Sequence, residues 1–216
     1  ASHDLRQPIH ALSLFGGALA KRPLDQQSRE IAEHMDLALQ SLASRLDSLL
    51  DISKLDAGIV QANNAVFNLR LMVERLQDEF MPAAQTKDLK VWLDCPDDIY
   101  VNTDELLLER IVRNLLANAI KYTDSGKIEI SVSGNNNKVT VNVRDTGRGV
   151  PDEEQEHIFE EFYQLSNPER DHTKGLGLGL AIVKRIVEWH HGNITIDNSA
   201  TLAGAQFSVT LPKAEG

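Results

Sequence analysis

Apolar residues at helical spacing in the first 57 positions constrain the fold of this chain more strongly than any other feature. They recur every three or four positions, which is the period of an α-helix with one buried face. A Pro-bearing segment, Lys21-Arg22-Pro23-Leu24-Asp25, separates two such stretches, so the sequence predicts a helical hairpin over about residues 2–57. The apolar positions are Leu5, Ile9, Leu12 and Leu19 in the first stretch and Ile31, Met35, Leu39, Leu42, Leu46, Leu49 and Leu50 in the second.

A hairpin of this length buries too little apolar surface to be stable alone. Two hairpins that pack as a four-helix bundle would bury it, so we expect residues 1–60 to form a homodimerisation domain. Pro8 lies inside the first predicted helix, where it removes a backbone hydrogen bond and is expected to kink the axis. The alternative is that Pro8 begins the helix.

The pattern changes after Gly58, and residues 61–216 are expected to form a second domain. Helices and strands mix there without a regular βαβ alternation, which favours an α+β fold, an α/β sandwich, over a doubly wound sheet. Residues 145–177 are polar and irregular, which indicates a functional loop. The expected elements are helices at 69–85, 104–122 and 178–190 and strands at 89–93, 127–132, 138–144, 193–197 and 205–211.

Composition limits the possible partners and compartments. The formal net charge of −10 argues against a nucleic acid or an anionic membrane as partner. Cys95 is the single cysteine, so no intrachain disulfide is possible, and the expected compartment is the cytoplasm. No apolar run is long enough to span a membrane. Because the chain opens with Ala-Ser-His, we expect a fragment whose missing N-terminal region is its only route to a membrane anchor.

The predicted helix at 104–122 carries polar residues on one face. Asn114, Asn118 and Lys121 follow one another at spacings of four and three, so their side chains share that face. Two amide oxygens and an ammonium suit a Mg²⁺–phosphate group, because Mg²⁺ prefers hard oxygen ligands and the cation can meet phosphate. The alternative is a solvated polar face.

Two glycine-containing segments follow. Asp145-Thr146-Gly147-Arg148-Gly149 comes directly after a strand, where a carboxylate can accept a hydrogen bond from an amine and glycines let the backbone approach a flat ring. Gly175-Leu176-Gly177-Leu178-Gly179 opens a helix and could present backbone N–H groups to phosphate. Taken alone, the first could be a plain loop and the second a hinge. Neither is a Walker A loop or a Rossmann fingerprint.

In this order and spacing, the three segments resemble the N, G1 and G2 boxes of the histidine-kinase catalytic domain. That domain belongs to an ATPase superfamily shared with DNA gyrase, mismatch-repair and heat-shock chaperone ATPases. Phe159-Glu160-Glu161-Phe162 is similar to the family's F box, whose aromatic residues anchor a lid; ordinary core packing is the alternative, and both interpretations imply that the two rings pack in the core. Gly204-Ala205-Gln206-Phe207 is similar to its terminal box, although a Ser or Thr is usual at the position of Ala205.

This resemblance implies ATP and Mg²⁺ as cofactors and a role for each matching residue. Asn118, helped by Asn114, would ligate Mg²⁺, while Lys121 would meet phosphate. Tyr122 would lie against the adenine, and Asp145 would read the adenine amine. The other implied nucleotide-binding residues are Gly147, Gly149, Lys174, Gly175, Leu176, Gly177, Leu178 and Gly179. Arg170 and Lys174 in the lid would contact phosphate, and the alternative is that these long cations are only solvated.

The segment Ser2-His3-Asp4-Leu5-Arg6-Gln7-Pro8 resembles the family's H box, with His3 as phosphoacceptor. A phosphorylated imidazole needs one neutral ring nitrogen exposed and the other held by an acceptor, and Asp4 is the adjacent carboxylate. The alternative is a surface histidine near a fragment end. His10 lies one heptad on without an acidic neighbour, and we expect it at a surface or interface. Gln7 shares the His3 face and is expected to favour kinase over phosphatase output, or only to contact the Pro8 kink.

The resemblance covers nearly the whole chain and implies a sensor histidine kinase of a two-component system. Such an enzyme phosphorylates its own histidine from Mg-ATP and passes the phosphoryl group to an aspartate of a response-regulator receiver domain. The forms Asp4-Leu5-Arg6-Gln7-Pro8 and Asn167-Pro168-Glu169-Arg170 are similar to those of hybrid sensor kinases. Two alternatives remain: an ATPase clamp whose hairpin only dimerises, and a signalling scaffold that binds nucleotide without phosphoryl transfer.

Overall fold

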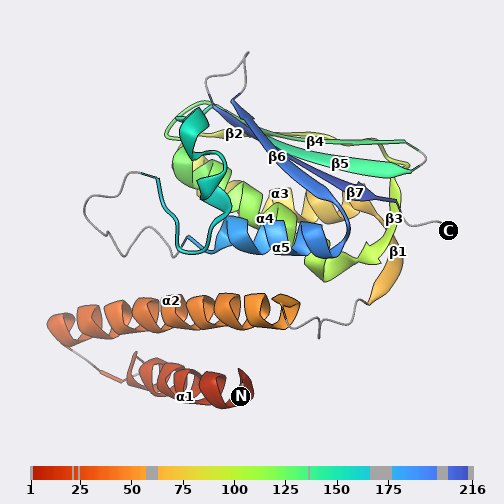
Figure 1. Ribbon diagram of the computed structural model, residues 1–216. Coiled ribbons are helices and arrows are strands. Elements are labelled where there is room, and N and C mark those ends of the chain that lie inside the picture. The colour runs from red at the N-terminus through yellow and green to blue at the C-terminus, as the bar shows by residue number, and fades with distance from the viewer. Residues whose placement is uncertain are drawn as a thin grey trace. The chain divides into compact units, whose positions relative to one another are not determined.

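The computed structural model describes residues 2–20, 22–23, 25–56, 63–135, 137–165, 177–198 and 204–213. The chain divides into two compact units, Ala1–Gly58 and Ile59–Gly216. The first unit is the predicted helical hairpin, which consists of α1 (Ser2–Ala20) and α2 (Gln26–Asp56) (Figure 1). Pro8 lies inside α1, so the alternative in which it begins the helix is wrong.

Local chemistry explains where α2 begins. The Asp25 carboxylate accepts hydrogen bonds from the backbone N–H of Ser28 at 2.7 Å and from the Ser28 hydroxyl at 3.2 Å. An aspartate before the first turn satisfies N–H groups that have no partner within the helix. The Ser28 N–H lowers the pKa of the Asp25 carboxyl, so the cap is charged at neutral pH. Asp25 therefore caps the start of the second helix.

The hairpin buries only part of its apolar surface within one chain. Gly16 is buried where α1 meets α2, and a Cβ at this position would lie 3.4 Å from the Met35 terminal methyl. Ala32 and Ile52 are also buried. Among the side chains of the two helices that the structure describes, nine large apolar ones are exposed: Leu12, Leu14, Phe15, Leu19, Ile31, Met35, Leu37, Leu42 and Leu49.

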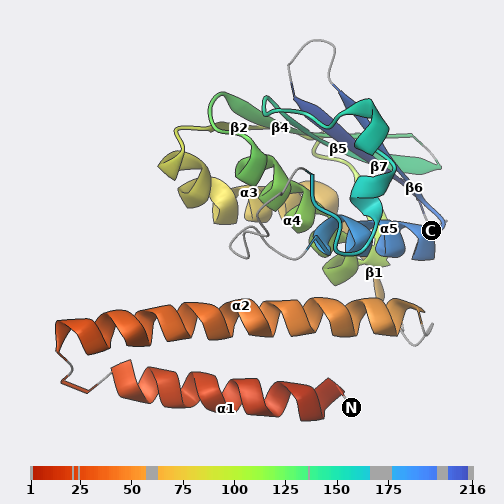
Figure 2. The same ribbon diagram turned by 60° about the vertical axis from the view of Figure 1, so that its left-hand side comes forward.

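The second unit is a two-layer α/β sandwich, as predicted. Its five-stranded sheet has the order β2-β4-β5-β7-β6; β2 and β4 are parallel and the other pairs antiparallel. Three helices, α3, α4 and α5, cover one face of this sheet (Figure 1, Figure 2). The helices are α3 (Leu69–Thr86), α4 (Glu105–Tyr122) and α5 (Gly179–Trp189), and the strands are β2 (Lys90–Asp94), β4 (Lys127–Gly134), β5 (Lys138–Asp145), β6 (Asn193–Asn198) and β7 (Ala205–Pro212).

The core lies between the sheet and the helices. Strands β4 and β5 alternate buried apolar residues with polar ones, so one face of the sheet is apolar. Ile128 and Ile130 of β4 are fully buried, as are Leu115 of α4 and Ile186 of α5. Each such side chain contributes about 1.5–3 kcal/mol relative to an exposed one. The other face of the sheet carries hydrogen-bonded polar pairs such as Thr140 with Thr210.

A second, two-stranded sheet was not predicted from the sequence. β1 (Asn64–Asn68) pairs antiparallel with β3 (Tyr100–Asp104), so that Val66 lies opposite Asn102. Asparagines at both ends of β1 make this segment look like a polar linker, and its partner strand is more than thirty residues away in the sequence. Neither strand shows a local signal that would reveal the pairing.

The helix α4 is held in place at its start and along its length. The Asp104 carboxylate accepts hydrogen bonds from the N–H of Leu107 at 3.1 Å and from that of Asn63 at 2.9 Å. It therefore caps the helix and also ties down the chain that enters β1.

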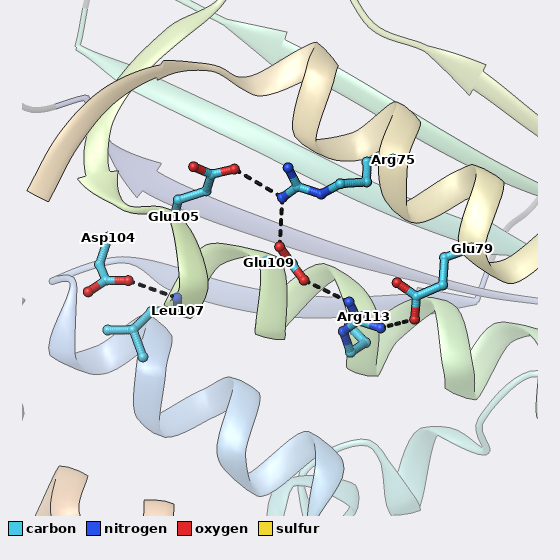
Figure 3. A network of polar contacts seen from close by, with 7 residues as sticks. All are labelled: Arg75, Glu79, Asp104, Glu105, Leu107, Glu109 and Arg113. Atoms are coloured by element: carbon cyan, nitrogen blue, oxygen red, sulfur yellow. Dashed lines mark hydrogen bonds and ion pairs between the residues drawn. The ribbon is translucent and has the colours of Figure 1, made fainter. Parts of the chain in front are cut away.

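Further along, an ionic network links α4 to α3 (Figure 3). Arg75 of α3 bridges Glu105 and Glu109 at 3.0 and 2.7 Å, while Arg113 of α4 pairs with Glu109 and with Glu79 of α3. The bond from Arg113 is the main cause of the lowered pKa of the Glu109 carboxyl. Because exposed pairs contribute roughly 0–1 kcal/mol each, the network matters mainly for the register of the two helices.

Candidate functional site

The C-terminal half of α4 carries the predicted polar face. The Asn114 side chain already has a hydrogen-bond partner, because its Nδ2 donates to the backbone oxygen of Arg110 at 2.8 Å. Its Oδ1 lies close to Gly179, where a Cβ would be only 2.9 Å away. Asn118 differs, because its half-buried amide has no hydrogen-bond partner among the residues that the structure describes. The first residue of α5 therefore packs against Asn114, whereas the Asn118 amide is available to a ligand.

Asp145 ends β5 and is the most buried charged group of the site, with 6 % of its surface exposed. Its Oδ1 accepts hydrogen bonds from the N–H groups of Gly147 at 2.8 Å and Ala205 at 3.3 Å. Within the described chain no bond reaches Oδ2, so this oxygen can accept one from a ligand. Burial raises the pKa of the carboxyl, and the two backbone N–H groups oppose that rise.

Two glycines near Asp145 lie where the neighbouring backbone leaves no room for a side chain. A Cβ on Gly147 would overlap the backbone oxygen of Tyr122, and one on Gly204 would overlap the backbone of Asp145 itself. Gly149 has a φ of 68°, in the left-handed region that glycine adopts without strain. The glycines of this loop thus permit close packing of the backbone around the carboxylate, while the predicted approach to a flat ring stays a prediction.

Tyr122 lies at the edge of the site with two cations near its ring. The Lys121 ammonium lies 4.8 Å from the ring centroid and the Arg148 guanidinium 5.0 Å, both within the range of cation–π attraction. A partly exposed aromatic ring with adjacent positive charge suits a ligand that combines a flat heterocycle with phosphates. Arg148 was not singled out from the sequence, since a loop arginine is most often solvated.

Asn198, at the end of β6, was also missed by the sequence analysis. It holds the backbone directly after the Asp145–Gly149 loop: its Oδ1 accepts from the N–H of Val150 at 3.0 Å, and its Nδ2 donates to the Val150 oxygen at 2.7 Å. No local signal could have revealed this residue, because its partner lies 48 positions away.

The second glycine segment is described only in part. Gly177 has a φ of 72°, and its oxygen accepts a hydrogen bond from the N–H of Phe162 at 3.2 Å. Leu178 is buried and Gly179 begins α5, as predicted. Four residues considered for phosphate or nucleotide contact lie outside the described residues: Arg170, Lys174, Gly175 and Leu176.

The two aromatic residues of the segment Phe159–Phe162 have different environments. Phe159 packs edge-to-face on Phe207, with centroids 6.4 Å apart, whereas Phe162 is 56 % exposed with a φ of 64°. The expected packing of both rings is therefore confirmed for Phe159 and wrong for Phe162.

Comparison with known proteins gives the family. Residues 103–215 match the model of histidine kinase-, DNA gyrase B- and HSP90-like ATPases, and residues 1–58 match the His Kinase A (phospho-acceptor) domain. The chain belongs to the histidine kinase family. The first match contains the site described above, and the second contains the hairpin.

The chain spans only part of the length of the curated relatives it matches. It is 29% identical over 213 residues to the sensor histidine kinase RcsC of Escherichia coli (strain K12), covering 98% of this chain but 22% of RcsC. It is 34% identical over 223 residues to the hybrid signal transduction histidine kinase D of Dictyostelium discoideum, covering 98% of this chain but 14% of that protein. The crystal structure of full-length ShkA in complex with AMPPNP superposes with a TM-score of 0.86 at 25% identity, over 100% of this chain and 45% of ShkA.

The predicted phosphoacceptor of this histidine kinase, His3, lies on α1 in the first unit, as do its neighbours Asp4 and Gln7. His3 and Asp4 are in the helix, but their side chains lie outside the description; Gln7 and His10 are exposed. Asn114, Asn118, Lys121, Tyr122 and Asp145 lie in the second unit. Among the described residues, no helix has both the length and the apolarity needed to cross a membrane.

Proposed function

We propose that this chain is the catalytic core of a sensor histidine kinase, which binds Mg-ATP and transfers the γ-phosphoryl group to His3. The observation that carries the proposal is the state of the Asp145 carboxylate. It is buried, its Oδ1 accepts hydrogen bonds from the N–H groups of Gly147 and Ala205, and its Oδ2 can accept one from a ligand. An adenine amine is a donor that fits this acceptor. Tyr122 would lie against the ring of the same base.

The residues of α4 fit the phosphate end of ATP. The Asn118 amide has no partner within the described chain, and the Asn114 amide is oriented by its bond to Arg110. Their oxygens would hold Mg²⁺, which supplies neutralisation of the phosphate charge when bound. Lys121 would meet the phosphates directly. The remaining contacts would come from the glycine segment, including Lys174, Gly175, Leu176, Gly177, Leu178 and Gly179.

In the proposed transfer, one imidazole nitrogen of His3 attacks the γ-phosphorus. A nitrogen–phosphorus bond forms, the bond to the bridging oxygen breaks, and ADP leaves. Asp4 takes the proton from the other ring nitrogen, so the product is a neutral phosphohistidine ring. The phosphoryl group would then pass to an aspartate of a response-regulator receiver domain. Because the reaction consumes ATP, we expect it in the cytoplasm.

The hairpin supports a homodimer. Leu14, Phe15 and Ile31 are each more than 60 % exposed on helices that otherwise pack on each other. An apolar surface of this extent is unusual for an isolated hairpin and is buried when two hairpins form a four-helix bundle.

Labelled ATP tests the proposal. Incubation of the native chain with γ-labelled ATP and Mg²⁺ should give acid-labile, base-stable phosphate on the protein, and His3→Gln should abolish it while ATP binding persists. Asp4→Asn should slow labelling by roughly 10²–10⁴-fold without weakening ATP binding. Label retained on His3→Gln would refute the assignment of His3. ATP turnover without labelled protein would instead indicate an ATPase clamp, and binding without turnover a scaffold.

Gln7 is proposed to bias the output of the same site towards kinase activity. It is exposed on α1, one helical turn after His3. Its amide is one methylene longer than that of Asn, so it would hold an attacking water less firmly near the phosphoaspartate of a docked receiver. Phosphorylated receiver mixed with the native chain should lose phosphate more slowly than with Gln7→Thr; an equal or faster loss would contradict the idea.

A further inference from the structure

Lys87, the C-cap residue of α3, is hydrogen-bonded to the backbone at the C-terminal end of α4. Its ammonium donates to the backbone oxygens of Ile120 at 2.8 Å, Lys121 at 3.0 Å and Thr123 at 3.2 Å. An ammonium has three donors, and all three are used. Nothing in the sequence analysis pointed to this residue.

The end of α4 needs such a partner. The last carbonyl groups of a helix have no partner within the helix, and a glycine that turns the chain back is the usual solution. Here α4 is followed by Thr123 in an extended conformation, with φ −107° and ψ 120°, so no such turn forms. A cation at this point also stabilises the negative end of the helix dipole. Lys87 therefore caps α4 from another element.

The backbone at the end of α3 directs Lys87 towards α4. The N–H of Leu89 bonds to the oxygen of Ala84 at 2.9 Å, and that of Asp88 bonds to Gln85 at 3.0 Å. Asp88 has a φ of 54°, and Leu89 is buried. These bonds form a Schellman motif, in which Lys87 is the C-cap residue. The backbone of Lys87 is thus held in a hydrogen-bonded turn, which fixes the direction in which its side chain leaves α3.

The same turn of α4 forms one wall of the candidate nucleotide site. Lys87 bonds the carbonyl groups of residues on both sides of Tyr122, while Gly147 lies against the carbonyl of Tyr122 itself. The last turn of α4 is therefore held between Lys87 and the Asp145–Gly149 loop. A displacement of about 1 Å in such a wall can cost on the order of 10²-fold in a positioned reaction.

The geometry points to Lys87 as a positioning residue for nucleotide binding, which acts through the backbone of α4 and without touching the ligand. This inference rests on the proposed ATP site. Lys87→Met keeps the aliphatic stem and removes the ammonium. Lys87→Arg keeps a cation. Lys90→Met is the matched control, because Lys90 is exposed on the adjacent strand and its side chain has no hydrogen-bond partner in the described chain.

The test is the dissociation constant for Mg-ATP, measured by calorimetry at a temperature where thermal unfolding shows each variant to be folded. Lys87→Met should weaken binding about tenfold, which corresponds to no more than one charge-assisted hydrogen bond. Lys87→Arg should recover most of the affinity, and Lys90→Met should bind like the native chain. Hydrogen exchange should become faster at residues 121–126 in Lys87→Met, with the amides of β4 and β5 unchanged.

Native affinity in Lys87→Met, with only its melting temperature lowered, would overturn the inference and leave Lys87 as a stabilising contact. If Lys87→Met does not fold, Lys87→Gln, which keeps two uncharged donors, replaces it and must show reduced affinity. Failure of the native chain to bind ATP would refute the proposed function instead, so the two failures are distinguishable.

Discussion

Asp145 is the residue at which stability and ligand binding make opposite demands. Burial raises the pKa of its carboxyl, which means that the environment disfavours the charged form. The N–H groups of Gly147 and Ala205 compensate in part, and both bind the same oxygen. A buried carboxylate oxygen without a hydrogen-bond donor lowers the stability of the ligand-free protein. Both oxygens of the carboxylate are hydrogen-bonded only when a ligand supplies the missing donor.

Asp145→Asn should separate these two effects. The amide oxygen can keep both backbone bonds, but its NH₂ group would face the adenine amine, so ATP affinity should fall at least tenfold. The free energy of unfolding at pH 7 should stay equal or rise by up to about 1 kcal/mol, because a desolvated charge is removed. Titration calorimetry and urea unfolding measure the two quantities. The exposed Asp124→Asn is the control and should change neither.

The raised pKa of Asp145 also gives the sign of a pH effect. The folded state binds a proton at a pH where the unfolded chain does not, so this group stabilises the fold as pH falls from neutral towards about 4. Native protein should therefore gain stability relative to Asp145→Asn over that range. An equal pH dependence in the two proteins would show that Asp145 is not desolvated.

Asn118 and Asn114 share a helix face but differ in their contacts, and mutations should reveal the difference. Asn118→Asp places a negative charge beside the phosphates and should reduce Mg-ATP turnover by roughly 10²-fold, with no loss of stability, since the native amide has no partner in the described chain. Asn114→Asp should also lower stability, because its Nδ2 bond to Arg110 is lost. Equal stability losses in both variants, measured by urea unfolding, would contradict this assignment.

At the scale of elements, contacts at three points along α4 fix the position of this helix. Asp104 caps its start, the Arg75–Glu109–Arg113 network aligns it with α3, and Lys87 satisfies its last carbonyl groups. The helix carries Asn114, Asn118, Lys121 and Tyr122, four of the predicted ATP-binding residues, so its placement affects the shape of the candidate site. Two of these three supports come from α3.

Asp104→Ala should lower the free energy of unfolding of the second unit by about 1–2 kcal/mol. The N–H of Leu107 would lose its cap and that of Asn63 its acceptor. Circular dichroism during thermal unfolding would measure the loss. Asp98→Ala, at an exposed position before β3, should leave the melting temperature unchanged. A similar shift in both variants would mean that charge and not capping is responsible.

At the scale of the whole molecule, the two units carry separable properties. Removal of the hairpin, in a chain that begins near Gln61, should give a monomer that still binds Mg-ATP, because the second unit has its own core. The complete chain should be a dimer, since its exposed apolar helix faces need a partner. Light scattering measures the mass of each. A dimeric truncated chain would place the interface in the second unit.

The sequence by itself determined the helical hairpin and the α+β class of the second unit, and it predicted the segments of the candidate site. Those properties are local: helical periodicity, a Pro-bearing turn, alternating strands and glycines beside Asp145 are each readable within a few residues. The tertiary structure alone decided which residues support the site. Lys87 reaches carbonyl groups 33 to 36 positions away, Asn198 clamps Val150 across 48, and β1 pairs with a strand beyond α3. Such contacts depend on how the chain folds back on itself, and a lysine or asparagine selected for them looks the same in the sequence as one that faces water.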